Sequence, residues 1–337
     1  MRLAPILLLL AASLASGQTP AREAFAKGVT EFRANRIAAA ADLFRQAAQL
    51  EPSMAEAHAN LGKCAYLLGR SEEAIEALRT AIRLQPGVAE PHYDLGHAYL
   101  LAKKVDEALS EFEILDRMEP ATARAPYGRA KAMEVRKDLP GALQALDVAL
   151  TRDAKHLPSL LLRGQLLAAQ GKNEEAVAAY RKAIEADPKS DQAYCRLGET
   201  LSRMRKHAEA EAAYAKAVEI SPNLALAHLG VGAARYNLNR FADASGPLEK
   251  AAELAPQWAQ AQLYAGNVRR QLGKWAEAEA AYQRTLQLDA KSAQAMYGLG
   301  LIRVQHKRWN DARVLASRIQ PRSRPCLATA RPHPGLS

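Results

Sequence analysis

The chain has 337 residues, of which 49% are hydrophobic, 24% charged and only 6% aromatic. This composition excludes an intrinsically disordered chain, and the scarcity of aromatic residues favours many thin helix–helix contacts over one thick core. The formal net charge is +10, and three cysteines are too few to make a disulfide scaffold.

The first residues have the sequence features of a secretory signal peptide. Arg2 supplies a positive start, residues 6–10 are an apolar run, and small residues precede a plausible cleavage site before Gln18. Residues 1–17 are therefore predicted to be a signal peptide, and the protein to be exported to the periplasm or secreted. An uncleaved anchor is the alternative, although the run is short for a membrane span, and no later stretch favours stable membrane insertion after signal removal.

The rest of the chain repeats with a period of 34 residues. Prolines stand at 52, 86, 120, 188, 222 and 256, alanines at every 34th position from 40 to 312, and glycines at 28, 62, 96, 164, 198, 232, 266 and 300, with alanine at 130. Such a period is the mark of a repeat architecture. The repeats are predicted to begin near 21, 55, 89, 123, 157, 191, 225, 259 and 293, the last one incomplete. A place in a repeat is counted below from these positions.

Each repeat is predicted to form two helices. In the second repeat, residues 55–68 and 72–84 have helical periodicity, Gly69 makes the turn between them, and Pro86 ends the second helix. Ser71 is expected to cap the second helix, with Glu72 and Glu73 near its positive end. The recurring small residues, Gly62 and Ala74 in this repeat, are expected where the two helices cross closely, with Leu61, Leu78 and Ile82 filling the space beside the crossing.

Prolines mark further features of the helices. Pro91, Pro126, Pro140 and Pro158 fall near expected helix starts, where proline is tolerated. Pro247 instead falls inside a second helix, where it should remove a backbone hydrogen bond and kink the helix. Helical periodicity stops near 320, and residues 321–337, with four prolines and three arginines, are predicted to be a disordered basic tail.

The positive charge is spread thinly. Arg2 and the tail arginines account for four charges, which leaves +6 over residues 18–320, where basic and acidic residues alternate along the helices. A solvated surface is therefore expected, and nucleic acid is not expected as a partner.

The sequence holds no signature of catalysis or cofactor binding. It lacks GxxxxGK[ST], GxSxG, HExxH and CxxC. His58, His92 and His228 share one place in their repeats, but no cysteine or carboxylate completes a metal site there, so packing is the favoured role. Cys64 is expected to be a small buried residue and Cys195 to face the surface of the first helices. No enzyme activity and no cofactor are predicted.

Residues 92–99 read His-Tyr-Asp-Leu-Gly-His-Ala-Tyr and are followed by Ala108, Phe112 and Pro120. This pattern resembles the tetratricopeptide repeat, W-x2-L-G-x2-Y followed by A-x3-F and P, although histidine or tyrosine often replaces the tryptophan. The resemblance covers about 21–320. It implies an all-α, right-handed superhelical solenoid over 18–320, in which the first helices line a concave groove that binds a protein or peptide.

The resemblance directs the second, fifth, ninth, twelfth and thirteenth places of each repeat to that groove. Aromatic rings mixed with long polar side chains at these places suit the capture of a peptide. The candidate residues are Phe25, Lys63, Tyr66, Tyr93, His97, Tyr127, Lys131, Gln165, Glu199, Arg203, Tyr236, Asn267, Arg270 and Tyr297. Some of them could instead only pack between neighbouring helices.

The favoured hypothesis is an exported, non-catalytic scaffold that binds a protein or peptide partner. Two alternatives stay open at this point. One is a structural or assembly factor that docks to a cell-envelope complex, and the other is the repeat region of a glycosyltransferase-like enzyme. Oligomeric state and the identity of the partner do not follow from the sequence.

Overall fold

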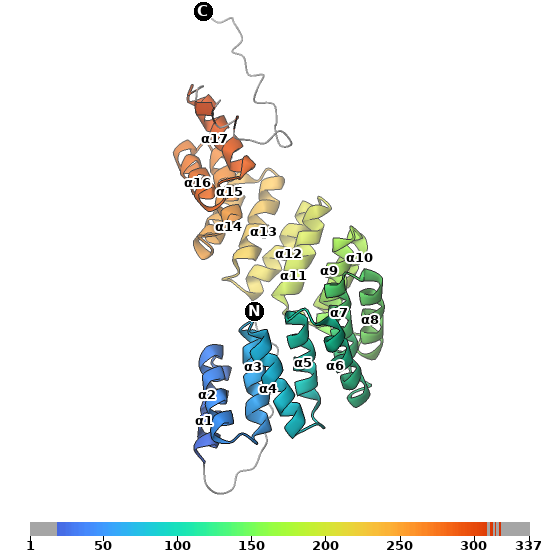
Figure 1. Cartoon of the computed structure of the whole chain (residues 1–337). Coiled ribbons are helices and arrows are strands. Elements are labelled where there is room, and N and C mark those ends of the chain that lie inside the picture. The colour runs from blue at the N-terminus through green and yellow to red at the C-terminus, as the bar shows by residue number, and fades with distance from the viewer. Residues whose placement is uncertain (1–18, 309–310, 313, 315–316, 318–337) are drawn as a thin grey trace, which may run out of the picture. The chain divides into compact units, whose positions relative to one another are not determined.

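The computed structural model describes residues 19–308 together with 311–312, 314 and 317. The predicted signal peptide and the predicted tail lie outside these residues. Within them the chain forms seventeen α-helices and no strands, arranged as consecutive pairs (Figure 1). The prediction of an all-α chain of tandem helix pairs is therefore confirmed. The chain divides into two compact units, which are described separately.

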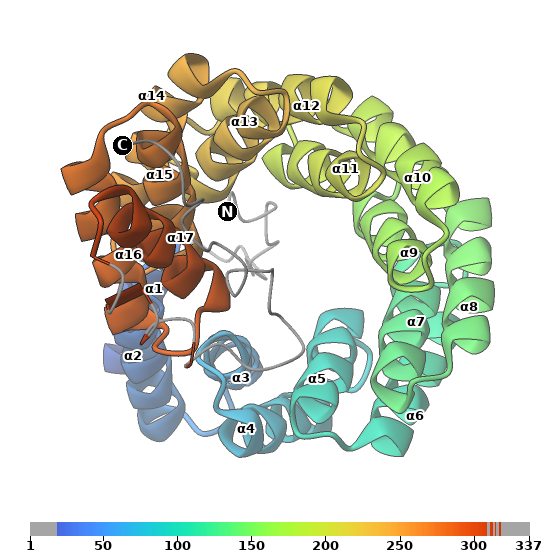
Figure 2. The same cartoon turned by 90° about the horizontal axis from the view of Figure 1, so that it is seen from above.

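The first unit ends at Leu166, inside α9, and its consecutive helices from α1 to α8 pack on one another. Its helices are α1 (Pro20–Arg33), α2 (Ile37–Leu50), α3 (Ala55–Leu67), α4 (Ser71–Leu84), α5 (Ala89–Leu101), α6 (Val105–Met118), α7 (Arg124–Arg136), α8 (Leu139–Arg152) and most of α9 (Leu157–Ala169). In Figure 2, α3, α5 and α7 lie on the inner side of the curve that this unit follows, and α4, α6 and α8 on its outer side. The first helices α3, α5 and α7 also contact one another directly.

The second unit begins at Leu167 and repeats the same pattern of packing. Its helices, after the end of α9, are α10 (Asn173–Ala186), α11 (Asp191–Arg203), α12 (His207–Ile220), α13 (Ala225–Asn237), α14 (Phe241–Leu254), α15 (Ala259–Gln271), α16 (Trp275–Leu288) and α17 (Ala293–Gln305). Here too the first helices α11, α13 and α15 contact one another in sequence.

In the first eight repeats, one large buried side chain at the twenty-fourth place fills the crossing of the two helices. In the second repeat, a Cβ atom built on Gly62 would lie 2.5 Å from Cγ of Leu78, and 3.1 Å from the carbonyl oxygen of Ala74. Such distances leave no room for a side chain, so the predicted close crossing at Gly62 and Ala74 is confirmed. Leu61 and Leu78 are buried beside it, as predicted.

Three of these large side chains touch a second glycine, in the repeat that follows. A Cβ on Gly96 or on Gly128 would lie 2.5 or 2.4 Å from the ring of Phe112, so this ring fills the space between α5 and α7. The same arrangement holds for two tyrosines of the second unit: Tyr214 lies against Gly198 and Gly230, and Tyr282 against Gly266 and Gly298. The ring therefore joins two consecutive repeats as well as the two helices of its own repeat.

The turn inside each repeat places one residue in the left-handed region. The fifteenth place has φ between 57° and 76° in all nine repeats: Gly69, Gly171 and Gly273, and also Asn35, Lys103, Lys137, Arg205, Asn239 and Lys307. Glycine adopts this conformation without strain, whereas a side chain with a Cβ atom costs about 1 kcal/mol there. The three lysines and the one arginine at this place are therefore strained.

We expect Arg205→Gly to raise the free energy of unfolding by about 0.5–1 kcal/mol, because it relieves a φ of 59°. Urea unfolding of the full chain measures the change. Lys189→Gly is the matched control, since Lys189 lies in a turn without a positive φ and the extra freedom of glycine in the unfolded chain should lower stability. Equal shifts for both variants would contradict strain at Arg205.

The structure corrects the prediction of the cap at the start of α4. Ser71 is the first residue of α4, the residue before it is Arg70, and no side chain caps that start. The expected cap by Ser71 is therefore wrong, although Glu72 and Glu73 do lie in the first turn. Side-chain caps occur elsewhere, from Thr19, Asp138, Ser190 and Ser292.

Pro247 lies inside α14, yet the helix runs unbroken from Phe241 to Leu254. Proline has no N–H group to give to the carbonyl group four residues earlier, that of Asp243. The guanidinium group of Arg235 donates to this oxygen instead, at 3.0 Å, while its Nε atom donates to Glu211 at 2.7 Å. A side chain from α13 thus replaces the backbone donor that the proline removes.

Candidate functional site

Four of the candidate residues gather on the first helices of unit 1. The ring centroid of His97, on α5, lies 4.5 Å from that of Tyr93 on the same helix, 6.1 Å from Tyr66 on α3 and 6.3 Å from Tyr127 on α7. Ring distances of this size are attractive contacts. These four residues are called the aromatic cluster below. Each is only partly buried, so the cluster forms part of the surface.

The aromatic cluster packs on Phe112, the buried ring that fills the crossing of α5 and α6. Phe112 of α6 is fully buried, and its ring centroid lies 5.4 Å from that of His97 and 6.4 Å from that of Tyr93, with interplanar angles of 69° and 61°. Because Phe112 is held between Gly96 and Gly128, the cluster stands on a rigid base. The twenty-fourth place thus positions the surface residues of α5.

His97 carries an unusual buried polar atom. Its Nε2 atom is buried and has no hydrogen-bond partner within the described residues. Burial, reinforced by the nearby charges of Lys131 and Arg124, lowers the pKa of His97 to about 4. The imidazole is therefore neutral at physiological pH, and an unpaired buried nitrogen of this kind costs about 1–3 kcal/mol of stability.

A network of charges borders the aromatic cluster. Lys63 of α3 donates to Glu90 at 2.7 Å and lies 3.5 Å from Asp94, both of α5. Arg124 of α7 also pairs with Glu90, and its guanidinium lies 4.3 Å from the ring centroid of Tyr93. The network therefore connects three consecutive repeats and fixes the tyrosine by a cation–π contact.

Two carboxyl groups of this network respond in opposite ways to their surroundings. Burial raises the pKa of Asp94 to about 6, although Lys63 opposes the shift. Burial also acts on Glu90, but the combined pull of Lys63 and Arg124 outweighs it and lowers the pKa of Glu90. The carboxyl group of Glu90 therefore stays ionised in mild acid, whereas that of Asp94 becomes protonated there.

We expect His97→Phe to change how stability depends on pH. His97 has a lowered pKa in the folded protein, so its contribution to stability is lost as the pH falls from 6.5 towards about 4. Asp94 has a raised pKa, so its contribution is present at low pH and lost as the pH rises through about 6. The two effects oppose each other in the wild type.

Without the imidazole only the effect of Asp94 remains. The free energy of unfolding of His97→Phe, relative to the wild type, should therefore rise by about 2 kcal/mol between pH 7 and pH 5, measured by urea unfolding. Asp94→Asn should show the opposite trend over the same range. A difference between His97→Phe and the wild type that does not change with pH would refute the buried neutral imidazole.

The remaining candidates of unit 1 have separate surroundings. Lys131 of α7 pairs with Glu134 at 2.5 Å, and Gln165 of α9 donates to the same carboxylate at 3.0 Å. Phe25 of α1 instead packs on the core, with its ring 5.4 Å from Phe44. Phe25 therefore serves packing more than surface recognition.

The candidates of unit 2 do not form one cluster. Glu199 and Arg203 pair with each other at 2.5 Å on α11, and Tyr236 of α13 contacts the ring of Tyr264 at 6.2 Å. Asn267 and Arg270 of α15 both bond to the hydroxyl group of Tyr282, at 2.8 and 3.3 Å. Tyr297 is half-buried on α17. Asn267 and Arg270 thus satisfy a core tyrosine of their own repeat.

Sequence reasoning missed several residues of the surface in unit 1. Glu90, Asp94 and Arg124 organise the charge network, and Glu90 and Arg124 stand at the second place that the repeat pattern had already marked. The exposed apolar residues Leu67 and Leu101 stand at the thirteenth place. A comparison of the same place across consecutive repeats would have revealed them.

The buried cysteines have structural roles, and so do the histidines that share one place in their repeats. Cys195 is buried, with 4% of its surface exposed, and burial raises the pKa of its thiol to about 12, so the prediction that it faces the surface is wrong. Cys64 is buried as predicted. His58 and His228 bond to the carbonyl oxygens of Pro52 and Pro222, at 3.1 and 2.8 Å.

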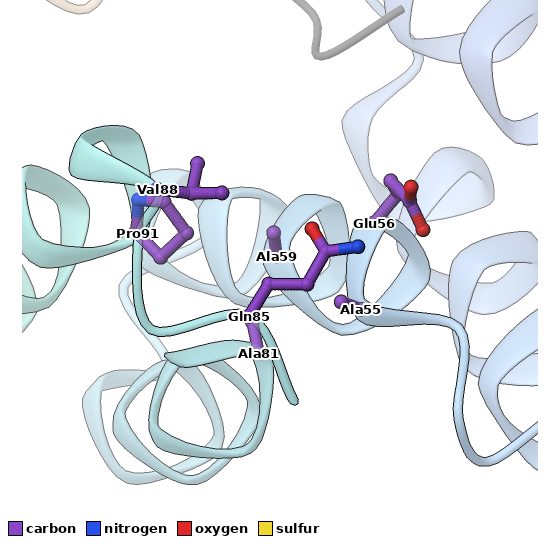
Figure 3. A pocket seen from close by; sticks show the side chains of 7 residues that line it. All are labelled: Ala55, Glu56, Ala59, Ala81, Gln85, Val88 and Pro91. Atoms are coloured by element: carbon purple, nitrogen blue, oxygen red, sulfur yellow. The ribbon is translucent and has the colours of Figure 1, made fainter. Parts of the chain in front are cut away.

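A small depression between the second and third repeats is too small for a ligand. It has a volume of about 10 Å³, room for roughly one water molecule, and is shown in Figure 3 with its lining residues Ala55, Glu56, Ala59, Ala81, Gln85, Val88 and Pro91. Over the described part of the chain, no group of three or more histidine, cysteine or carboxylate side chains could hold a metal ion. No described helix is both long and apolar enough to cross a bilayer.

Known protein families match most of the chain. Models described as tetratricopeptide repeat match residues 25–89, 229–292 and 263–325, residues 69–133, and residues 191–224, and a model described as TPR repeat matches residues 164–204. No curated protein matches the sequence.

Solved structures of low sequence identity share the fold. The C-terminal part of a TPR repeat-containing protein from Cytophaga hutchinsonii aligns with a TM-score of 0.55 at 18% identity, over 72% of this chain and 99% of that one. The APC/C hetero-tetramer Cut9–Hcn1 gives 0.56 at 16%, over 84% of this chain and 56% of that one. The pilF protein of Pseudomonas aeruginosa gives 0.55 at 19%, over 61% and 94%.

Proposed function

Because the chain belongs to the tetratricopeptide repeat family, we propose that it is a non-catalytic scaffold that binds a protein or peptide partner. The binding surface is the face of α3, α5 and α7, which carries Lys63, the aromatic cluster and Lys131. The observation that carries this proposal is the aromatic cluster itself. It presents four partly exposed rings on a rigid base, which is the kind of group that dominates protein interfaces.

The second unit offers less for such an interaction. Its polar candidates are engaged in pairs within one helix or with a buried tyrosine. We therefore place the main contact with the partner on unit 1 and treat Glu199, Arg203, Tyr236, Asn267, Arg270 and Tyr297 as secondary positions.

The proposal also includes export from the cytoplasm. It rests on residues 1–17, which read as a signal peptide. Expression of the full chain in a bacterial host, followed by N-terminal sequencing of the protein from the periplasm and the medium, tests this. A mature N-terminus at Gln18 supports export, and an intact N-terminus in the cytoplasm contradicts it.

Affinity capture tests the scaffold function. The purified full chain is immobilised and exposed to a cell-envelope extract, next to the variants Tyr93→Ala and Tyr127→Ala, with circular dichroism to show that each variant is folded. The partners captured by the wild type should be lost from both variants. Leu84→Asp is the control, because Leu84 lies on α4, outside the proposed surface, and should capture the same partners. Identical capture by all four proteins would contradict the proposed surface.

A further inference from the structure

Basic residues gather at the turns inside the last four repeats, all in unit 2. The segments that cover these turns, each following a first helix, contain eleven lysines and arginines against four carboxylates; they are 201–210, 235–244, 269–278 and 303–312. The equivalent segments of the first four repeats contain seven of each; they are 31–40, 65–74, 99–108 and 133–142. The excess of positive charge is therefore a local feature of unit 2.

The four turns lie on one edge of unit 2. The first helices α11, α13, α15 and α17 contact one another in sequence, and a short turn at each end joins them to antiparallel second helices, so all four run in the same direction. Their carboxyl ends, and the turns that follow, share one side, called the basic edge below. The segments of the opposite edge contain six carboxylates and only two lysines; they are 184–193, 218–227, 252–261 and 286–295. The two edges therefore differ in the sign of their charge.

Three cations of the basic edge are exposed and not neutralised. Arg205, Lys274 and Lys307 have exposed side chains, and the ion pairs that the described residues form along this edge involve other cations, such as Arg235 with Glu211 at 2.7 Å. The three stand in the turns of the sixth, eighth and ninth repeats. Their charge is therefore available to a partner outside the chain.

Two of these cations stand where glycine would be more stable. Arg205 and Lys307 have φ of 59° and 57°, at the place that Gly273 occupies in the eighth repeat. In that repeat glycine relieves the backbone, and the exposed cation is the next residue, Lys274. Strain of this kind persists where the side chain serves something other than stability. The strain at Arg205 and Lys307 therefore favours a role for the charge itself.

Apolar side chains lie among the cations of the basic edge. Leu272 is 37% exposed and stands two residues before Lys274, and Trp275, which follows Lys274, is partly exposed. Phe241 is also partly exposed, at the same place of the seventh repeat as Trp275. Cations combined with aromatic and aliphatic groups are typical of a surface that meets lipid headgroups, because the apolar groups reach the acyl boundary while the cations stay at the phosphates.

The distribution of charge favours a bilayer over other anionic partners. The cations are spread over four turns instead of surrounding one point, which suits a partner whose charge is spread over a surface. Anionic lipids move laterally and can gather beneath each cation. The phosphates of a nucleic acid have fixed positions along a strand, and its backbone offers no apolar counterpart to Leu272.

We infer that the basic edge of unit 2 docks on the anionic surface of a lipid bilayer. Arg205, Lys274 and Lys307 contact the headgroup phosphates, and Leu272 and Trp275 lie at the boundary with the acyl chains. This contact is peripheral, and it uses residues other than those of the partner surface proposed on unit 1. Because charge supplies most of the attraction, binding weakens as salt is added.

Sedimentation with lipid vesicles tests this inference on the full chain. One set of vesicles is phosphatidylcholine alone, and the other holds equal amounts of phosphatidylcholine and the anionic lipid phosphatidylglycerol. The ratio of the two partition coefficients is measured, because it removes the contribution that the apolar run at residues 6–10 makes to both. The wild type should prefer the anionic vesicles at least about a hundredfold at low salt and lose preference as salt rises. Equal partition into both sets would overturn the inference.

Charge removal connects the preference to the basic edge. A cation near an anionic membrane strengthens binding about fivefold. The triple variant Arg205→Gln, Lys274→Gln and Lys307→Gln should therefore lower the ratio at least about tenfold. Circular dichroism shows that the variant is folded, as expected for three exposed positions.

A second triple variant of unit 2 is the matched control. Lys182→Gln, Lys189→Gln and Lys291→Gln remove the same net charge from exposed lysines that lie away from the basic edge, on α10 and in turns of the opposite edge. This variant should keep the wild-type ratio. If both triple variants lower the ratio equally, only the net charge matters, and the inference fails.

The apolar contact and the kind of anion are tested in the same assay. Leu272→Gln should weaken binding to the anionic vesicles about threefold or more, while Leu226→Gln, with a similar exposed leucine at the start of α13 on the opposite edge, should leave it unchanged. Polyuridylic acid and polyglutamate are added as competitors at the same concentration of charge. If either one displaces the protein from the vesicles, the edge prefers a nucleic acid or an acidic protein, and the assignment to a bilayer is wrong.

Discussion

Phe112→Ala is expected to lower the free energy of unfolding of unit 1 by about 3–5 kcal/mol, the loss that accompanies removal of a fully buried phenylalanine ring. The ring fills the space between Gly96 and Gly128, and neither glycine has a side chain that could move into the cavity. The loss should therefore fall at the upper end of this range. Urea unfolding of the full chain, followed by circular dichroism, measures it.

Phe112→Leu is the matched control for this effect. Leucine occupies the same place in the second, fourth and seventh repeats, as Leu78, Leu146 and Leu248, all fully buried. The leucine variant should therefore lose only about 1 kcal/mol. It should also retain more of the aromatic cluster's geometry. Equal losses for the alanine and leucine variants would show that Phe112 does not fill the crossing as described.

Gly128→Ala is expected to lower the free energy of unfolding by roughly 1–3 kcal/mol, because the added Cβ atom would lie 2.4 Å from the ring of Phe112. The direction of this change in stability is informative. At an uncrowded helical position, replacing glycine by alanine would instead stabilise the protein by about 1 kcal/mol. The ring cannot move aside, because Gly96 bounds it on the opposite side. The same urea unfolding experiment measures the change.

Two controls accompany Gly128→Ala. Gly87→Ala adds the same methyl group to an inter-repeat turn of the same unit, where nothing lies within 4 Å, and should leave stability unchanged or slightly higher. In a Phe112→Leu background the loss caused by Gly128→Ala should shrink, since every described leucine at this place precedes a residue larger than glycine at the sixth place. A loss that is the same in both backgrounds would exclude Phe112 as its cause.

The 34-residue register predicted the helix pairs because the period appears in the identities of single residues. Gly62 and Ala74 predicted a crossing that the structure confirms, and Pro91 and Pro126 predicted helix starts. Ser71 misled because the preceding residue, Arg70, takes the capping position and its side chain caps nothing. A choice of cap between adjacent residues depends on the exact turn geometry, which no pattern of apolar residues encodes.

The candidate surface could be predicted only in part. The repeat pattern pointed to Tyr66, Tyr93, His97 and Tyr127, which the structure brings together. It could not distinguish them from Asn267 and Arg270, which bond to Tyr282. Which long polar side chain is satisfied from within depends on the residue that fills the core beneath it, and this pairing lies across two helices. The prediction for Cys195 failed for a related reason, since its place is only partly buried in some repeats, as at Tyr93 and Tyr127, and buried in others.

Because each of these buried rings contacts glycines in two repeats, the repeats cannot be rearranged freely in evolution. Phe112 matches the third repeat to a fourth that offers Gly128, and Tyr214 and Tyr282 match the sixth repeat to Gly230 and the eighth to Gly298. Repeats that share one length and one register are nevertheless not interchangeable modules. A duplication or shuffling event that separates such a ring from its following glycine would create a clash, so these neighbours should be inherited together as two-repeat cassettes.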